Sequence, residues 1–468
     1  MFEEKNQTGS RGEPPDETVG SGHPTPRIIP SPPRPGRSHT EDLAYLETIR
    51  NGLAQLFPGG TAAEQYEIME RIERIKGTAC GAQVVAASMM EKGLVEIRVE
   101  SGTHENNPAY GIGVQAGQAR RESPAKGRSF MAYCARMIAD LPLTFAALPL
   151  TFAALLAGDI NETQAMIIDK ESAHLLEADR QQLDADLLRS PGALEGMGER
   201  MLTDQVRRLA YTYDSADALT RLEEAKTCRY AAAFPARDGM MKLSGSLSIE
   251  DGLAVQKALD EEAARLKAAG DPRTLAQLRA DILVDRVTGG TVTKETKIML
   301  HLVMTDRTLF QGDSEPAHLV GYGTVPASWA RIVIAGREPA DRERYRGMVS
   351  LKRIYTHPDT GALTAMDSRS RQFPQALRQM INIRDRYCRT SYCNAPIKEF
   401  DHVVQHSRGG ETSALNGAGR CRACNATKEQ SGWDERVQDT GGRHTIVITT
   451  PVGATFTSVA PPMPGTPL

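Results

Sequence analysis

The sequence predicts a mainly α-helical protein with a small α+β part near the C-terminus. Three observations lead to this fold class. Helix-favouring residues are abundant, and aromatic residues make up only 5% of the 468 residues. From about residue 41 to residue 290, apolar residues recur at three- and four-residue spacing, the period of a helix buried on one face. Four cysteines are concentrated in the last fifth of the chain, which indicates a different kind of unit there.

The composition is that of an ordinary soluble protein long enough for two or three domains. The net charge is −3, so the chain as a whole does not predict a polyanionic partner. Residues 378–433 differ, because they hold nine Lys or Arg against five Asp or Glu. Such a basic segment suits a local contact with nucleic acid, and a solvated basic face explains it equally well.

No segment predicts a membrane partner. Residues 1–40 lack the apolar core of a signal peptide, and the apolar stretch 141–157 is short and contains two prolines. Thiolates that bind a metal must stay reduced. We therefore expect a cytoplasmic protein.

The domain order follows from composition and pattern. Residues 1–40, with eight prolines and five glycines, are expected to form a disordered tail, and residues 438–468 a second tail. A mainly helical domain of uncertain function is expected at 41–345, a β-hairpin connector at 346–376 and a small α+β domain at 377–437. Helices are predicted at 41–57, 61–90, 112–139, 161–187, 198–226, 249–268 and 273–288, with strand-favouring runs at 229–248 and 298–304.

Residues 112–139 could form a helix-turn-helix. Ser123 can cap the second helix and Pro124 can open it, and Arg120 and Lys126 lie beside the turn. Two interpretations stay open: an element that reads DNA, and an ordinary helix pair of a bundle, which is the commoner case.

The cysteines form two pairs. Cys388 and Cys393 are spaced C-x4-C, and Cys421 and Cys424 are spaced C-x2-C. Two thiolate pairs at this separation can close a tetrahedral site, so we predict a structural Zn²⁺ rather than four unrelated buried thiols.

Polar residues with catalytic chemistry lie between the cysteine pairs and directly after them. Residues 400–433 are predicted to form a ββα unit, with a turn at Gly409 and Gly410 and a helix opening at Cys421. The residues of this unit whose side chains could hold a metal ion or activate a water are Asp401, His402, Asn416 and Asn425.

This arrangement resembles the HNH endonucleases, whose ββα-metal motif has Asp-His, then Asn, then His or Asn. The matching residues are Asp401-His402, Asn416 and Asn425, followed by Lys428. Residues 384–389, 359–361, 321–323 and 270–274 also resemble a large bacterial subfamily that carries a long helical N-terminal domain of unknown function. The resemblance covers roughly residues 41–437 and is most specific at 384–433.

The resemblance implies a metal-dependent endonuclease that hydrolyses phosphodiester bonds of DNA, double-stranded DNA above all, and nicks one strand per active site. His402 would deprotonate the attacking water, and Asp401 and Asn425 would hold a catalytic Mg²⁺ or Mn²⁺. Asn416 would brace the loop and orient His402. The predicted phosphate contacts are Arg386, Arg389 and Lys428.

Several alternatives stay open. His406 could assist as a ligand or be a loop residue without a metal role. A homodimer could convert nicks into double-strand breaks. The protein could also be a non-catalytic, zinc-containing nucleic-acid-binding module, or a regulatory protein with a vestigial nuclease domain.

Overall fold

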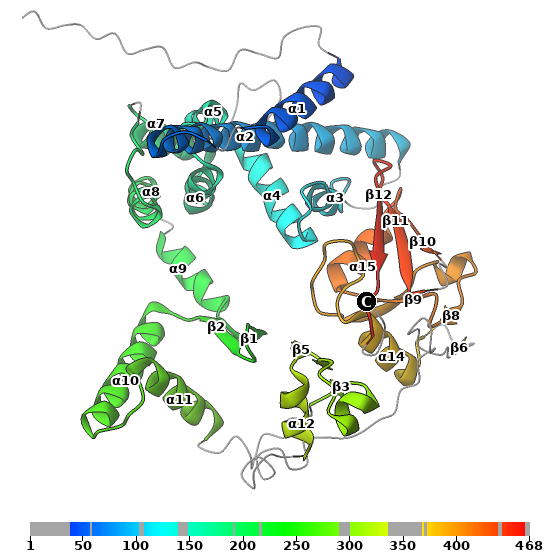
Figure 1. The fold of residues 1–468 in the computed structure, drawn as a ribbon. Coiled ribbons are helices and arrows are strands. Elements are labelled where there is room, and N and C mark those ends of the chain that lie inside the picture. Colours follow the sequence, from blue (N-terminus) through cyan, green and yellow to red (C-terminus); the bar gives the residue numbers. More distant parts are fainter. Residues whose placement is uncertain are drawn as a thin grey trace, which may run out of the picture.

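The computed structural model describes residues 38–56, 59–102, 107–138, 148–190, 192–214, 218–289, 300–335, 367–368, 372–438 and 442–463. Within these ranges the protein is mainly helical with a few small sheets (Figure 1). No helix in the described ranges is long and apolar enough to span a membrane. The predicted tail before residue 38 and most of the predicted connector at 346–376 lie outside them.

The N-terminal part is a helical bundle whose helices begin at recognisable caps. Thr61 and Asn161 each form a capping box, which satisfies the first amides of the helix that follows. Side chains such as Val84, Ile168 and Leu202 are fully buried in the bundle core. The helices are α1 (His39–Ala54), α2 (Ala62–Ser101), α3 (Ile112–Ala119), α4 (Pro124–Met137), α5 (Pro149–Ala157), α6 (Glu162–Ser172), α7 (Glu177–Leu187) and α8 (Glu199–Tyr213).

Helices α3 and α4 approach each other closely through glycines. A Cβ atom on Gly127 would lie only 2.0 Å from the carbonyl oxygen of Gly113, so no side chain fits there. Ser123 caps α4 as predicted, with its side chain accepting from the amide of Lys126. Arg120 pairs with Glu122 and Glu162 instead of facing solvent, and α3 is buried along its length. The structure therefore favours the bundle interpretation of this helix pair over a DNA-reading one.

Two smaller units follow the bundle. The first, residues 218–289, contains α9 (Ala218–Thr227), the antiparallel hairpin β1 (Tyr230–Pro235) and β2 (Met241–Ser246), and the helices α10 (Ile249–Ala268) and α11 (Leu275–Thr288). The second contains β3 (Leu302–Val303), β4 (Ala317–Leu319) and β5 (Gly323–Val325), which pair in that order, a π-helical turn η1 (Arg307–Gln311) and α12 (Ala327–Ala335).

Residues 372–463, here called the C-terminal module, hold the predicted site. The strand β7 (Glu399–His402) pairs antiparallel with β9 (Gly417–Arg420), with Asp401 opposite Ala418, and α15 (Arg422–Lys428) follows directly. β7 ends at His402, so Val403 and Val404 lie beyond the strand. The other elements of the module are α14 (Gln375–Asp385), the 3-10 turn η2 (His406–Arg408) and β8 (Thr412–Ser413), which pairs with β6 (Asp367–Ser368).

The prediction of a C-terminal tail from residue 438 is wrong for residues 442–463. β10 (Asp434–Gln438), β11 (Thr445–Thr449) and β12 (Thr455–Val459) form an antiparallel sheet. The proline content suggested disorder, but Pro451 lies in the turn between β11 and β12, where a missing amide costs nothing. Ile446 and Ile448 on the central strand are fully buried.

The bundle and the C-terminal module share a core. Val114 of α3 is 1% exposed and belongs to one buried cluster with Val403, Trp433 and Ile446. The amide of Val452 also donates to the side-chain oxygen of Gln115, at 3.4 Å. α3 therefore packs against the module as well as against α4.

Candidate metal centre and polar site

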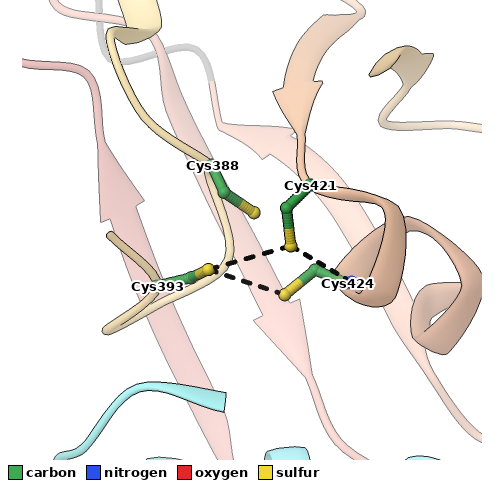
Figure 2. A group of neighbouring side chains, drawn as sticks. All are labelled: Cys388, Cys393, Cys421 and Cys424. Atoms are coloured by element: carbon green, nitrogen blue, oxygen red, sulfur yellow. Dashed lines mark hydrogen bonds between the residues drawn. The ribbon is translucent and has the colours of Figure 1, made fainter. Parts of the chain in front are cut away.

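The four cysteines converge from two separate segments. Cys388 and Cys393 lie in the loop after α14, whereas Cys421 caps α15 and Cys424 lies in its first turn. Figure 2 shows the four sulfur atoms pointing toward one another, and all of them lie within 4.8 Å of each other. The Cys424 and Cys393 sulfurs are 3.7 Å apart, and the Cys393 and Cys421 sulfurs 4.0 Å.

This geometry fits a tetrahedral metal ion. Four sulfurs bound at about 2.3 Å to one zinc ion lie about 3.8 Å apart, close to the observed separations. Hydrogen bonds from the other three thiols lower the pKa of Cys388 far below its usual range, and accordingly the pKa values of those three are raised. The cluster could therefore hold a metal ion such as zinc.

Asp401 lies at the end of β7 beside a buried cation. Its Oδ2 atom is 2.9 Å from the ammonium of Lys428, and its Oδ1 atom accepts from the amide of His402 at 2.9 Å. Burial is the largest single effect and opposes ionisation of this carboxyl, but the charge and hydrogen bond of Lys428, together with the amide and ring of His402, outweigh it and lower the pKa of Asp401. Asp401 is thus held as a carboxylate at neutral pH.

His402 is buried and held on several sides. Its Nε2 atom is 2.8 Å from the hydroxyl of Thr412, and its ring packs against Phe373 with centroids 4.7 Å apart. The Nδ1 atom lies 3.8 Å from Oδ1 of Asp401. His406 is exposed on η2, with its ring centroid 5.6 Å from that of His402.

Asn416 ties the loop between β7 and β9 together. Its side-chain oxygen accepts from the amide of Val404 at 2.8 Å, and its Nδ2 donates to the carbonyls of Val404 and Glu411. A Cβ on Gly410 would lie 1.8 Å from the Val404 carbonyl, so glycine is required for this loop to close. These bonds occupy the Asn416 side chain within the loop.

Asn425 on α15 presents a buried amide oxygen to the site. Its Nδ2 donates to the carboxylate of Glu399 on β7 at 2.9 Å, which fixes the orientation of the amide. Its Oδ1 atom is buried and has no hydrogen-bond partner among the described residues. A buried oxygen without a partner is costly, and a bound cation is one way to satisfy it.

Of the three predicted phosphate contacts, Arg389 and Lys428 are buried instead of exposed to a DNA backbone. Arg389 is buried and donates to Asp385, Ser458 and the carbonyl of His444. Lys428 is buried between Asp401, Glu429 and the carbonyl of His402. Because both charges are satisfied inside the module, neither is retained as a phosphate contact. Arg386 is half-buried and donates to the carbonyl of Pro462 at 2.7 Å.

A buried ionic network explains the remaining basic residues. Arg384 donates to Asp385 and to the carbonyl of Gly417, and Asp385 in turn accepts from the amide of Gly419 at 2.8 Å. Arg420 is completely buried and pairs with Glu435. These residues connect α14, β9 and β10. Part of the basic charge in residues 378–433 is therefore internal, and the exposed part comes from Arg378, Lys398, Arg408 and Arg422.

Comparison with known proteins finds a family match in the part of the chain before the C-terminal module. A family model described as a domain of unknown function (DUF222) matches residues 79–385. No curated protein and no solved structure matches the chain. The matched region ends at Asp385, so most of the C-terminal module lies beyond it.

Proposed function

Because the chain belongs to the DUF222 family, whose description names no activity, we propose a function from its C-terminal module: a metal-dependent HNH endonuclease that hydrolyses DNA. The observation that carries the proposal is the buried Oδ1 atom of Asn425, which lacks a partner among the described residues. It belongs to the helix that follows β7 and β9, and β7 ends in Asp401 and His402.

The cysteine cluster would hold a structural Zn²⁺. Cys421 and Cys424 are at the start of α15, so a metal bound to all four cysteines would fix this helix to the loop that carries Cys388 and Cys393. Since Asn425 directly follows Cys424, the zinc site would also hold Asn425 in place.

Asp401 and Asn425 would hold the catalytic Mg²⁺ or Mn²⁺ through one carboxylate and one amide oxygen. When bound, the ion would stabilise the negative charge that develops on the phosphate and on the leaving oxygen. Glu399 supports this role because it accepts a hydrogen bond from Nδ2 of Asn425. The oxygen of the same amide is then left for the ion. Lys428 keeps Asp401 ionised.

His402 would act as the general base. In the tautomer whose Nε2–H donates to the Thr412 hydroxyl, the basic lone pair would be on Nδ1, on the side of Asp401. Nδ1 would then accept the proton of the attacking water. The exposed basic residues Lys398, Arg408 and Arg422 replace the predicted phosphate contacts, because exposed cations can reach the DNA backbone.

One observation favours a second candidate, a zinc-containing module that binds nucleic acid without cutting it. The ammonium of Lys428 already binds Oδ2 of Asp401. A module that never binds the catalytic ion would need such a cation to neutralise this carboxylate. This alternative predicts binding without cleavage.

Cleavage of supercoiled plasmid tests the proposal. Zinc-loaded wild type with Mg²⁺ or Mn²⁺ should produce nicked circles, and His402→Ala should reduce the rate about 100-fold or more, since general-base catalysis contributes that much. His406→Ala is the matched control, because this exposed histidine lies beside His402 without contacting Asp401 in any described bond. If wild type binds DNA but cleaves none with either ion, the binding module replaces the nuclease.

A further inference from the structure

Arg420 at the end of β9 is a completely buried cation with one unused hydrogen-bond donor. Its Nη1 atom donates to the hydroxyl of Thr390 at 2.8 Å, and its Nη2 atom pairs with Glu435. The Nε atom is also buried and has no hydrogen-bond partner among the described residues. Leaving a buried N–H without an acceptor is costly, so an acceptor is expected beside it.

The Arg420 side chain connects the two halves of the cysteine cluster. Arg420 directly precedes Cys421 in the chain. Thr390, which it binds, lies between Cys388 and Cys393, and the carbonyl of Thr390 accepts from the amide of Cys393 at 2.9 Å. One guanidinium therefore belongs to the segment of the second cysteine pair and holds the loop of the first.

The sulfur atoms lie within electrostatic reach of this guanidinium. Burial opposes the charge of Arg420, but attraction to Glu435, Cys388 and Cys424 outweighs burial and raises the pKa of Arg420. Cysteines bind a metal ion as thiolates, and four thiolates carry twice the charge of one zinc ion. The occupied centre would therefore be a dianion, partly buried, and would need positive charge or N–H donors nearby.

The buried ionic network of the module has the opposite imbalance. It contains three guanidinium groups, those of Arg384, Arg389 and Arg420, but only two carboxylates, those of Asp385 and Glu435. One positive charge is thus in excess among these buried groups. Buried charge without a counter-charge is strongly unfavourable. A dianionic metal centre beside Arg420 would supply that counter-charge.

We propose that Arg420 is the counter-charge of the metal centre, and that its Nε–H donates a hydrogen bond to a metal-bound cysteine sulfur. Arg420 is then a positioning residue, which acts on the ion through the sulfur. Its charge offsets part of the negative charge of the four thiolates and so raises the affinity of the site for the ion. The inference rests on the metal site of the proposed function, but it does not depend on DNA cleavage.

Two variants separate the charge of Arg420 from its ion pair. Removing Arg420 alone would leave Glu435 as an unpaired buried charge and destabilise the fold. Glu435→Gln keeps an acceptor for Arg420 and leaves the guanidinium in place. Arg420→Met combined with Glu435→Gln removes both charges at similar volume, a replacement that buried ion pairs often tolerate. Both variants lack the ion pair, so the difference between them reports Arg420 itself.

Cobalt binding by the full-length protein provides the measurement. Zinc-free protein is titrated with Co²⁺ against a chelator, and the sulfur-to-cobalt charge-transfer band is recorded. Glu435→Gln should bind Co²⁺ at least as tightly as wild type, because the positive excess grows. The double variant should bind about 10- to 100-fold more weakly than Glu435→Gln, as for other groups that support metal ligands.

The position of the band adds a readout that a purely structural role would not change. Without the N–H donor, the sulfur lone pair is less stabilised, so the band of the double variant should lie at lower energy than that of Glu435→Gln. This energy reports the sulfur and not the stability of the fold. Circular dichroism should show equal helix content in the three cobalt-loaded proteins.

Three outcomes overturn the proposal. Equal weakening of Co²⁺ binding by Glu435→Gln and by the double variant would assign the effect to the ion pair. Equal affinity and equal band energy in the two variants would show that Arg420 does not act on the sulfurs. Wild type without the charge-transfer band would remove the metal centre, and this role of Arg420 with it. A lack of DNA cleavage would leave all of these cobalt measurements unchanged, so the two proposals fail separately.

Discussion

Asn425 illustrates how one neighbouring side chain can decide the chemistry of another. An asparagine amide can present either its oxygen or its nitrogen to a site. A carboxylate can accept hydrogen bonds but cannot donate them. Glu399 therefore binds the Nδ2 end of the Asn425 amide, and Oδ1 is directed elsewhere. Glu399 lies two residues before Asp401 on the same strand, and thus a single strand supplies both the proposed metal ligand and the group that orients the second one.

Replacing Glu399 should therefore weaken binding of the divalent ion. In Glu399→Ala the Asn425 amide can rotate, and we expect the dissociation constant for Mn²⁺ to rise about tenfold, as for other residues that orient a ligand. Glu399→Gln, which keeps an accepting oxygen, should restore most of the affinity. Calorimetric titration of zinc-loaded protein measures this without any cleavage assay, and Glu411→Ala, an exposed carboxylate of the same loop, is the control. Unchanged Mn²⁺ affinity in Glu399→Ala would contradict the role.

His444 should make the C-terminal module sensitive to acid. Burial and the nearby charges of Arg384 and Arg389 lower the pKa of His444 to about 3. The unfolded chain takes up this proton near pH 6.5, whereas the folded module does not, so stability falls as the pH drops from about 6.5 toward 3. By about pH 4 the loss should reach about 3 kcal/mol.

The measurement compares denaturant unfolding of wild type and His444→Asn at pH 7 and at about pH 4, followed by tryptophan fluorescence. His444→Asn should be less stable at pH 7, because His444 also bonds Arg389 and the carbonyl of Leu415. Its additional loss on acidification should be smaller than that of wild type. A loss of equal size in both proteins would show that other groups cause the acid sensitivity.

Sequence spacing predicts the residues of the candidate site but not their surroundings. The spacing of the cysteines and of Asp401, His402 and Asn425 can be read from the sequence without any knowledge of the fold. Burial is not local. Lys428 was taken for a surface cation because nothing in its sequence neighbourhood shows that Asp401 lies within reach. Arg389 was taken for one because Ser458 and His444, which bind it inside the module, are far away in the sequence. The partner role of Glu399 was missed for the same reason.

At the scale of elements, the pair α3–α4 depends on the absence of side chains. A Cβ on Gly127 of α4 would lie within 2.6 Å of backbone atoms of Gly113 and Gly117 of α3, so there is room for backbone alone. Such contacts replace interlocking side chains with backbone packing, so even one methyl group must force the helices apart.

Gly127→Ala should destabilise the bundle by about 3 kcal/mol, at the upper end of the range for overpacked sites. Gly93→Ala in α2 is the control, because a Cβ there meets nothing within 4 Å. The control should be neutral or stabilising by about 1 kcal/mol, since alanine is the better helix former. Thermal unfolding followed by circular dichroism measures both. Equal stability of the two variants would mean that α3 and α4 can separate without cost.

The predictability of the elements follows from the range of the interactions that form them. Most bundle helices were predicted because their caps and apolar periodicity are read within one or two turns, as with Ser123 and Pro124 before α4. β11 and β12 were missed because a proline-rich composition was taken for disorder. Their stability comes from pairing with β10 and from packing against distant residues, and composition carries no sign of either.

At the scale of the whole molecule, the predicted helical domain and the predicted C-terminal domain share one buried cluster. Val114 of α3 lies in the core of the C-terminal module, between residues that flank the polar site. An apolar side chain such as Val114 in a helix is expected to be buried, but its sequence does not show that its neighbours are Val403 and Trp433. The contact joins segments at opposite ends of the chain, which sequence alone cannot pair.

A fragment of residues 372–463 should therefore be less stable than the same module in the full chain, even with zinc. Without α3, Trp433 loses its neighbours at Gly111 and Val114 and becomes more exposed. We expect its fluorescence to shift to longer wavelength. In the full chain, Val114→Ala should destabilise the module by about 2 kcal/mol. A zinc-loaded fragment with the stability and emission of the full chain would show that α3 is dispensable.

The position of Val114 also affects how the protein is made. During synthesis, α3 leaves the ribosome long before Val403, Trp433 and the strands β11 and β12. The shared core can close only after residues up to Ile448 have emerged. Chains that stop before β11 would lack this core, so the proposed site would gain its folded surroundings only after β11 and β12 have been made.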